Sequence, residues 1–223
     1  MTLKNEQEAL LGIIDRMLTN LLASITIKNS DSAKLRAQIG ALRVDAIVDV
    51  SEGVFLDQLG VCFDAAYALP VALSGLTKLH DDLLKETATG EYTDNIVGCS
   101  LVICMATESK LISGLVFKSL DDANATMQTM TQAFSSVGER VVEFDDPSIY
   151  LALIKLQASV TAHLASTARP LPRIVTFDLP TGLPALALSN RIYYDPSRWE
   201  EIVDENKIVH PAFCPREIRG LAS

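Results

Sequence analysis

The residues best suited to chemistry form one dense acidic cluster near the C-terminus: Glu200, Glu201, Asp204 and Glu205. Carboxylates at this spacing lie on one side of a helix, where they can hold a metal ion or work as a general acid and base. The same pattern is typical of a solvated helix face or of a surface that pairs with arginine. We favour this second interpretation.

The remaining reactive side chains are scattered along the chain. The four cysteines form no Cys-x-x-Cys pair, and the three histidines lie far from them in the sequence: Cys62, Cys99, Cys104 and Cys214, with His80, His163 and His210. This spacing does not predict a zinc site, and without a secretory signal we expect no disulfides. A serine nucleophile would need a base and an orienting group, which the scattered histidines do not suggest. We therefore expect no enzyme, no metal and no cofactor.

Composition and charge divide the 223 residues into two parts. The chain is 48% hydrophobic and carries a net charge of −9, which excludes intrinsic disorder and argues against broad binding to nucleic acid. The part from Arg169 onward contains seven basic and seven acidic residues, so the whole negative charge lies in residues 1–168. We predict a domain boundary at this point, with domains over 1–168 and 169–223.

Residues 1–168 are predicted to form successive amphipathic helices. In the first helix, apolar residues recur at steps of three and four: Leu10, Ile14, Met17, Leu21 and Ile25. We expect a break near Ser30, helical structure over 54–86 with an interruption at Pro70, and a buried helix over 96–117 whose polar segment 107–110 interrupts it. The apolar stretch 96–106 is about half the roughly 20 residues that a membrane span requires, so we expect no membrane partner.

Two later helices carry start and stop signals. Ser119 is expected to cap one helix, which Gly138 should end, and Asp146 should cap the next, with Pro147 at its first position. The proline-rich segment 170–172 should end this last helix.

The C-terminal part has a different pattern. A strand over 173–177 should precede a helix over 184–193, a second helix from Asp195 to Asn206, and a return strand over 217–221. Trp199 lies on the apolar side of the second helix, and we expect it to be the largest contributor to a small core. The predicted fold is mainly α, a helical domain followed by a small βααβ module.

Several motifs in this module match a known pattern. They are Leu183-Pro184-Ala185-Leu186, Arg191-Ile192-Tyr193, Glu201-Ile202-Val203, Asn206 and His210-Pro211-Ala212-Phe213. The layout resembles a LysM-like module, and residues 146–223 resemble the C-terminal part of Mu-like phage DNA circularisation proteins, which are tail and baseplate components.

This resemblance implies a structural protein of a contractile-tail baseplate, made in the host cytoplasm and resident in the virion, with other tail proteins as partners. The module would be a protein–protein adaptor. The residues expected to bind flank its groove or lie beside it: Thr181, Gly182, Tyr193, Tyr194, Arg198, Asn206, Ile208, Pro211 and Arg216. Six of the chain's arginines lie from Arg169 onward, and the guanidinium suits paired contacts with carboxylates, so we expect docking on acidic neighbours through Arg198 and Arg216.

Two other functions remain open. LysM modules commonly bind N-acetylglucosamine chains, so the module would bind peptidoglycan if it followed those relatives. DNA-end binding or circularisation follows only from the family's name, and a neutral module in an acidic chain has no basic stripe for a duplex.

Overall fold

The computed structural model describes residues 3–69, 73–86, 90–142 and 147–222. These residues form nine α-helices, one short 3-10 helix and a two-stranded sheet near the C-terminus, so the protein is mainly helical, as predicted. The chain divides into two compact units: residues 1–115 with 129–162, and residues 116–128 with 163–223. Each unit is described separately below.

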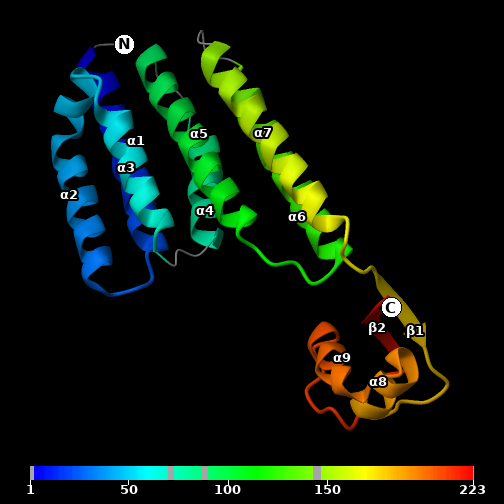
Figure 1. Ribbon diagram of the computed structural model, residues 1–223. Helices are drawn as coiled ribbons and strands as arrows, with labels where there is room; N and C mark the ends of the chain where they lie inside the picture. The colour runs from blue at the N-terminus through cyan, green and yellow to red at the C-terminus, as the bar shows by residue number, and fades with distance from the viewer. Residues whose placement is uncertain (1–2, 70–72, 87–89, 143–146, 223) are drawn as a thin grey trace. The chain divides into compact units, whose positions relative to one another are not determined.

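Five helices build most of the first unit (Figure 1): α1 (Leu3–Ser24), α2 (Ser30–Ser51), α3 (Phe55–Tyr67), α4 (Leu73–Leu84) and α5 (Glu91–Ser113). α1 packs against α2 and α4, while α5 packs against α3 and α4. The predicted stripe from Leu10 to Leu21 is buried throughout α1, and Ile25, just after the helix, is buried as well, which confirms the periodicity of the first helix. We call these five helices the helical body.

The ends of the first helices follow from local hydrogen bonds. α2 begins after Asn29, whose side chain accepts a hydrogen bond from the Ser32 amide, while the Ser32 hydroxyl accepts one from the Asn29 amide. This reciprocal cap explains the break predicted near Ser30. The predicted helical segment 54–86 consists of two helices, and the expected interruption at Pro70 lies outside the described residues.

The predicted interruption of the buried helix at 107–110 is wrong, because α5 continues through it to Ser113. Thr107 and Ser109 are buried, and their hydroxyls donate to backbone carbonyls one turn earlier, so a continuous helix satisfies them. Residues Thr93–Ser113 are long and apolar enough to cross a membrane by length and composition, although the apolar run 96–106 is shorter. Most of this window is buried within the protein, which is typical of a core helix.

Two further helices follow, α6 (Leu120–Val141) and α7 (Pro147–Ala168). The Ser119 hydroxyl accepts a hydrogen bond from the Asp122 amide and so caps α6, as predicted. The expected stop at Gly138 is wrong: α6 runs three residues further, and the buried Val141 continues its apolar face. α7 begins at Pro147 as expected, whereas its predicted cap, Asp146, lies outside the described residues.

The C-terminal module consists of β1 (Ile174–Asp178), α8 (Ala185–Tyr193), the 3-10 helix η1 (Pro196–Arg198), α9 (Trp199–Glu205) and β2 (Glu217–Leu221). The strands pair antiparallel, with Ile174 opposite Leu221 and Asp178 opposite Glu217. Residues 116–128 group with this module because the Leu120 amide donates to the Pro172 carbonyl, and the Ile174 amide donates to the Asp121 carboxylate. The predicted boundary at Arg169 stays a prediction.

Candidate binding surface of the C-terminal module

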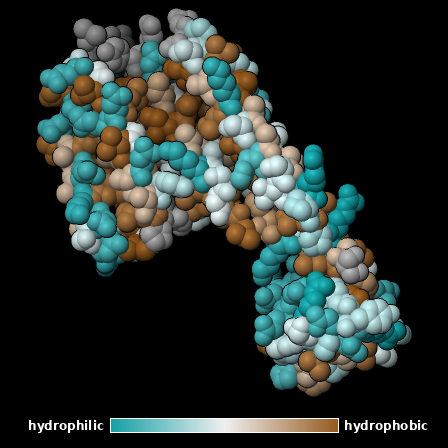
Figure 2. All heavy atoms as spheres, in the orientation of Figure 1, coloured by the Kyte–Doolittle hydropathy of each residue, from teal (hydrophilic) through white to brown (hydrophobic). Residues whose placement is uncertain are grey.

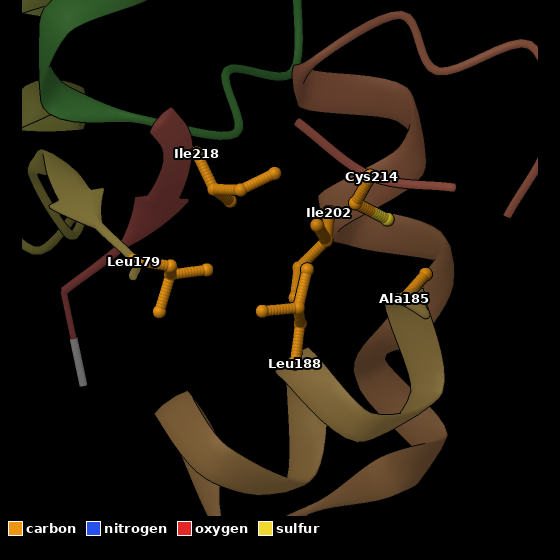
Figure 3. Packing of buried hydrophobic residues seen from close by; sticks show 6 residues of the cluster. All are labelled: Leu179, Ala185, Leu188, Ile202, Cys214 and Ile218. Carbon is orange, nitrogen blue, oxygen red and sulfur yellow. The ribbon is translucent and has the colours of Figure 1, made fainter. Parts of the chain in front are cut away.

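The module is organised around a small apolar core, and its six buried members are shown in Figure 3: Leu179, Ala185, Leu188, Ile202, Cys214 and Ile218. Leu188 of α8 and Ile202 of α9 meet at the centre of this cluster, and Ile218 joins them from β2. Trp199 is partly buried against the cluster, so it contributes to the edge of the core.

Two glycines let backbone segments approach closely. A Cβ atom on Gly182 would lie 2.6 Å from the carbonyl oxygen of Cys214, so this glycine brings the loop after β1 against the loop before β2. A Cβ atom on Gly220 would lie 2.6 Å from the Tyr193 hydroxyl. Gly182, predicted as a binding residue, is therefore also needed for packing between the two loops that flank the predicted groove.

Asn206 and Tyr193 hold the second strand in place. The Asn206 amide nitrogen donates to the Arg219 carbonyl at 2.7 Å, and its amide oxygen accepts from the Arg219 amide at 2.8 Å. The Tyr193 hydroxyl accepts from the Leu221 amide at 2.9 Å, and burial raises the pKa of this phenol. Both residues were predicted to face a partner, and both make contacts within the module.

Arg198 is engaged in the same way. Its guanidinium lies 3.9 Å from the centre of the Tyr193 ring, and its nitrogens donate to both carboxylate oxygens of Glu201 at 2.7–3.1 Å. Hydrogen bonding to Glu201 raises the pKa of the Arg198 guanidinium. The side chain is thus held inside a stacked, bidentate contact, which reduces what it can offer to an acidic neighbour.

The acidic cluster of α9 faces cations. Besides the pair between Glu201 and Arg198, Glu205 lies 3.1 Å from Arg219, and Asp204 lies 3.7 Å from Lys118. These contacts agree with the predicted arginine-facing surface. No group of three or more histidine, cysteine, aspartate or glutamate side chains that could hold a metal ion occurs among residues 3–69, 73–86, 90–142 and 147–222.

Three of the predicted binding residues lie where the two loops meet. We call this region the loop edge, and define it as Thr181, Gly182, Val209, Pro211 and Phe213. The Pro211 carbonyl accepts a hydrogen bond from the Ala185 amide at 2.7 Å, which joins the second loop to the start of α8. The visible face of the module is mainly hydrophilic (Figure 2), yet Val209 is 99% exposed and Phe213 is 79% exposed.

Contacts within the loop hold the residues around Phe213 in place. The ring of His210 lies 5.3 Å from the Phe213 ring, and the His210 Nδ1 accepts a hydrogen bond from the Ala212 amide. Ile208, a predicted binding residue, packs against the core and supports the loop from inside. The apolar side chains of Val209 and Phe213 therefore project from a loop that is anchored on both sides.

The last two predicted residues are exposed. Tyr194 adopts a left-handed conformation, with φ of 57°, at the end of α8, and is 90% exposed. Arg216 is exposed just before β2, and no ion pair of its guanidinium occurs within the described part of the chain. Arg216 is thus better placed than Arg198 to meet an acidic partner.

Reasoning from the sequence missed Val209 and Phe213 as binding residues. Phe213 belongs to the His-Pro-x-Phe motif, but an aromatic residue there is equally expected in a core. The available signal is an apolar pair in the loop that contains Pro211 and Pro215, where neither helical nor strand periodicity can bury it.

The helical body contains the other unusual polar groups. His80 of α4 and Glu108 of α5 are each 2% exposed, with 3.6 Å between Nδ1 and a carboxylate oxygen. Neither His80 nitrogen has a hydrogen-bond partner among the residues that the structure describes. Burial raises the pKa of the neighbouring Cys104 thiol well above its usual value, and the Glu108 charge adds to this shift. A buried thiol with a raised pKa is a poor nucleophile.

Comparisons with known proteins do not assign this chain to a family. The sequence matches no protein-family model, and a search of curated proteins found no match.

Proposed function

We propose that this protein is a structural component of a contractile phage tail baseplate, in which the helical body packs within the assembly and the C-terminal module is a LysM-like protein–protein adaptor. The proposal is supported by the motifs between residues 146 and 223 that resemble Mu-like phage tail proteins. It requires folded surfaces and no catalytic centre. Its partners would be other tail proteins, and its location the tail baseplate.

The observation that carries the proposal is the apolar loop edge. Val209 and Phe213 are highly exposed, on a module whose visible face is mainly hydrophilic in Figure 2. Burying one such side chain at an interface contributes roughly 1.5–3 kcal/mol, and interface energy is commonly concentrated in a few aromatic and arginine side chains. Phe213 and Arg216 lie three residues apart and offer both kinds of contact, and the Arg216 guanidinium makes no ion pair with any residue that the structure describes.

The experiment is incorporation of variants into tails. Phe213→Ser and Arg216→Glu should each reduce the amount of this chain in purified tails at least about tenfold, which corresponds to a loss of about 1.4 kcal/mol of docking free energy. Val175→Ser is the matched control, because Val175 is an exposed apolar residue of β1 that lies outside the loop edge. Normal incorporation of both loop-edge variants would contradict the proposal.

Arg198→Glu is a poor test, although Arg198 was predicted to dock. Its reversal would place two negative charges together and remove the stack on Tyr193, so lost incorporation would report unfolding of the module. Circular dichroism of each purified variant separates folding from docking.

Peptidoglycan binding is the second candidate, and the exposed aromatic rings of Phe213 and Tyr194 favour it, because such rings stack on sugars. The purified protein would then sediment with insoluble peptidoglycan, and Phe213→Ala would abolish this retention. An adaptor would remain in the supernatant.

A further inference from the structure

α2 has two apolar faces, and only one of them is covered. Leu35, Ile39, Leu42 and Ala46 are buried, and α2 packs against α1 and α3. A second series of apolar residues, which we call the outer stripe, recurs at steps of four, four, three and four: Ala33, Ala37, Ala41, Val44 and Val48. All five are exposed. This spacing is that of a helix that packs along a second helix.

The outer stripe is too apolar for a face that only meets water. Val44 is 83% exposed and Val48 is 53% exposed, with Ile47 beside them at 49%. α2 lies at the outer edge of the helical body (Figure 1). The first half of the stripe consists of alanines, so another helix could approach its backbone closely.

Charges along one edge of the stripe indicate what covers it. Lys34 lies near the start of α2, whereas Asp45 and Glu52 lie near its end, all on the same side of the stripe. Asp45 and Glu52 make no ion pair within the described residues, and Lys34 makes an exposed contact of 3.0 Å with Asp31, a kind of pair that contributes little.

The charged side chains on the opposite edge of the stripe already have partners within the helical body. Arg36 donates to the carbonyl of Ile25, and Arg43 forms an ion pair with Asp15. Along the first edge, the charge is therefore positive at Lys34, whose ion pair with Asp31 is exposed, and negative at Asp45 and Glu52. When a second copy lies antiparallel, the positive end of this edge faces the negative end of the same edge on the other copy.

We propose that a second copy of this chain docks on the outer stripe, with the two α2 helices antiparallel about a two-fold axis near Ala41. Residue 34 of one copy then lies opposite residue 48 of the other, so each Lys34 sits between Asp45 and Glu52 of the second copy. The symmetry repeats this contact on the other side of the axis. In a parallel pair, this edge would lie beside the opposite edge of the second copy, whose Arg36 and Arg43 already make contacts within the helical body, so Lys34 would not reach Asp45 and Glu52.

The contact is the length of one helix, about 33 Å for 22 residues, and lies at the small end of stable interfaces. We therefore expect a dimer that dissociates on dilution. The inference concerns the helical body and does not depend on the function proposed for the C-terminal module.

The first test is sedimentation of the full chain over a range of concentrations. The unmodified protein should shift from monomer to dimer, and Val44→Glu should weaken dimerisation at least about 100-fold. Val116→Glu is the matched control, because Val116 is also exposed but lies outside α2. A protein that stays monomeric at about 100 µM, or a dimer that Val44→Glu leaves intact, would overturn the proposal.

Charge exchange tests the complementarity. Lys34→Glu should weaken the dimer, and adding Asp45→Lys and Glu52→Lys to the same chain should restore it. Failure of the triple variant to recover dimerisation, when it is folded by circular dichroism, would refute this pairing.

Disulfide trapping tests the orientation. Ala41→Cys lies near the axis and should cross-link to its own copy under mild oxidation. Ala33→Cys should not, because eight residues on each side of the axis separate the two cysteines by about 24 Å. The unmodified chain, with its four native cysteines, is the control. Equal cross-linking of Ala33→Cys would indicate a parallel pair or an unrelated contact, and would overturn the proposal.

Discussion

The helical body and the C-terminal module are stabilised in different ways. The body buries many large side chains completely, including Ile14, Leu18, Leu21, Phe55 and Phe63. The module has a core of six residues, two of which are alanine and cysteine. Apolar burial contributes in proportion to area, so the body has far more of this stabilisation than the module has.

Their polar side chains differ accordingly. In the body, the buried His80 and Glu108 retain polar atoms without hydrogen-bond partners. In the module, Asn206 and Tyr193 use their polar atoms to hold β2. The comparison teaches that a large core tolerates a poorly satisfied polar pair, whereas a small core depends on well-satisfied ones. Four predictions test this difference, from the largest expected effect to the smallest.

The largest effect should follow from splitting the buried pair of the body. His80→Leu leaves the Glu108 carboxyl buried beside an apolar residue, which should lower the free energy of unfolding by about 3–5 kcal/mol. Adding Glu108→Met should recover most of this loss, because both polar groups are then removed. Urea unfolding followed by circular dichroism measures both variants. If His80→Leu were as stable as the unmodified protein, His80 would not stabilise the buried Glu108 carboxyl, and the prediction would be wrong.

The next effect concerns the module's core. Leu188→Ala should destabilise the module by about 2–5 kcal/mol, since the small cluster has little with which to fill the cavity. Hydrogen exchange should then lose protection over residues 174–222 and keep it in α1–α5. Leu186→Ala is the control, because Leu186 lies on the same helix and is exposed. Equal loss of protection in the body would show that the two regions do not have separate cores.

A smaller effect is expected from removing the two hydrogen bonds between the Asn206 side chain and the Arg219 backbone. Asn206→Ala removes the partners of the Arg219 amide and carbonyl, which should cost about 1–3 kcal/mol. Asn206→Asp keeps the acceptor and loses the donor, so its melting temperature should fall between those of the unmodified protein and the alanine variant. The same melting temperature for all three proteins would show that these two hydrogen bonds do not stabilise the module.

The smallest effect is a pH dependence at the start of η1. Hydrogen bonds from the Ser197 hydroxyl and amide lower the pKa of Asp195 in the folded module. A carboxyl whose pKa is lower in the folded state stabilises above its unfolded pKa, and loses that contribution as the pH falls through its folded pKa. Asp195→Ala should therefore melt below the unmodified protein at neutral pH and together with it in strong acid. A constant difference in melting temperature would contradict this linkage.

Local patterns predicted much of the fold. The stripe from Leu10 to Ile25 identified the buried face of α1, and the return strand over 217–221 has the bounds expected. The helix end predicted at Gly138 and the interruption predicted at 107–110 were wrong. Tertiary packing overrides a local stop signal when the helix has an apolar face to continue. The periodic signal is strongest where burial repeats regularly.

The candidate site was less predictable for a physical reason. Residue type does not say whether a polar side chain turns inward: Asn206 and Arg198 were expected to face a partner, and each makes its contacts within the module. Those contacts join residues that are three to thirteen positions apart and depend on loop geometry. Arg216 and Phe213 stand out only when exposure is known.

Our central proposal is that this chain is a component of a contractile-tail baseplate. Its most direct test is mass spectrometry of contractile tails purified from cells that carry its gene, before and after the baseplate is dissociated. We expect the chain in intact tails and then in the dissociated baseplate fraction, together with its neighbouring subunits. Its absence from intact tails, or its presence only in the unassembled soluble fraction, would contradict the account.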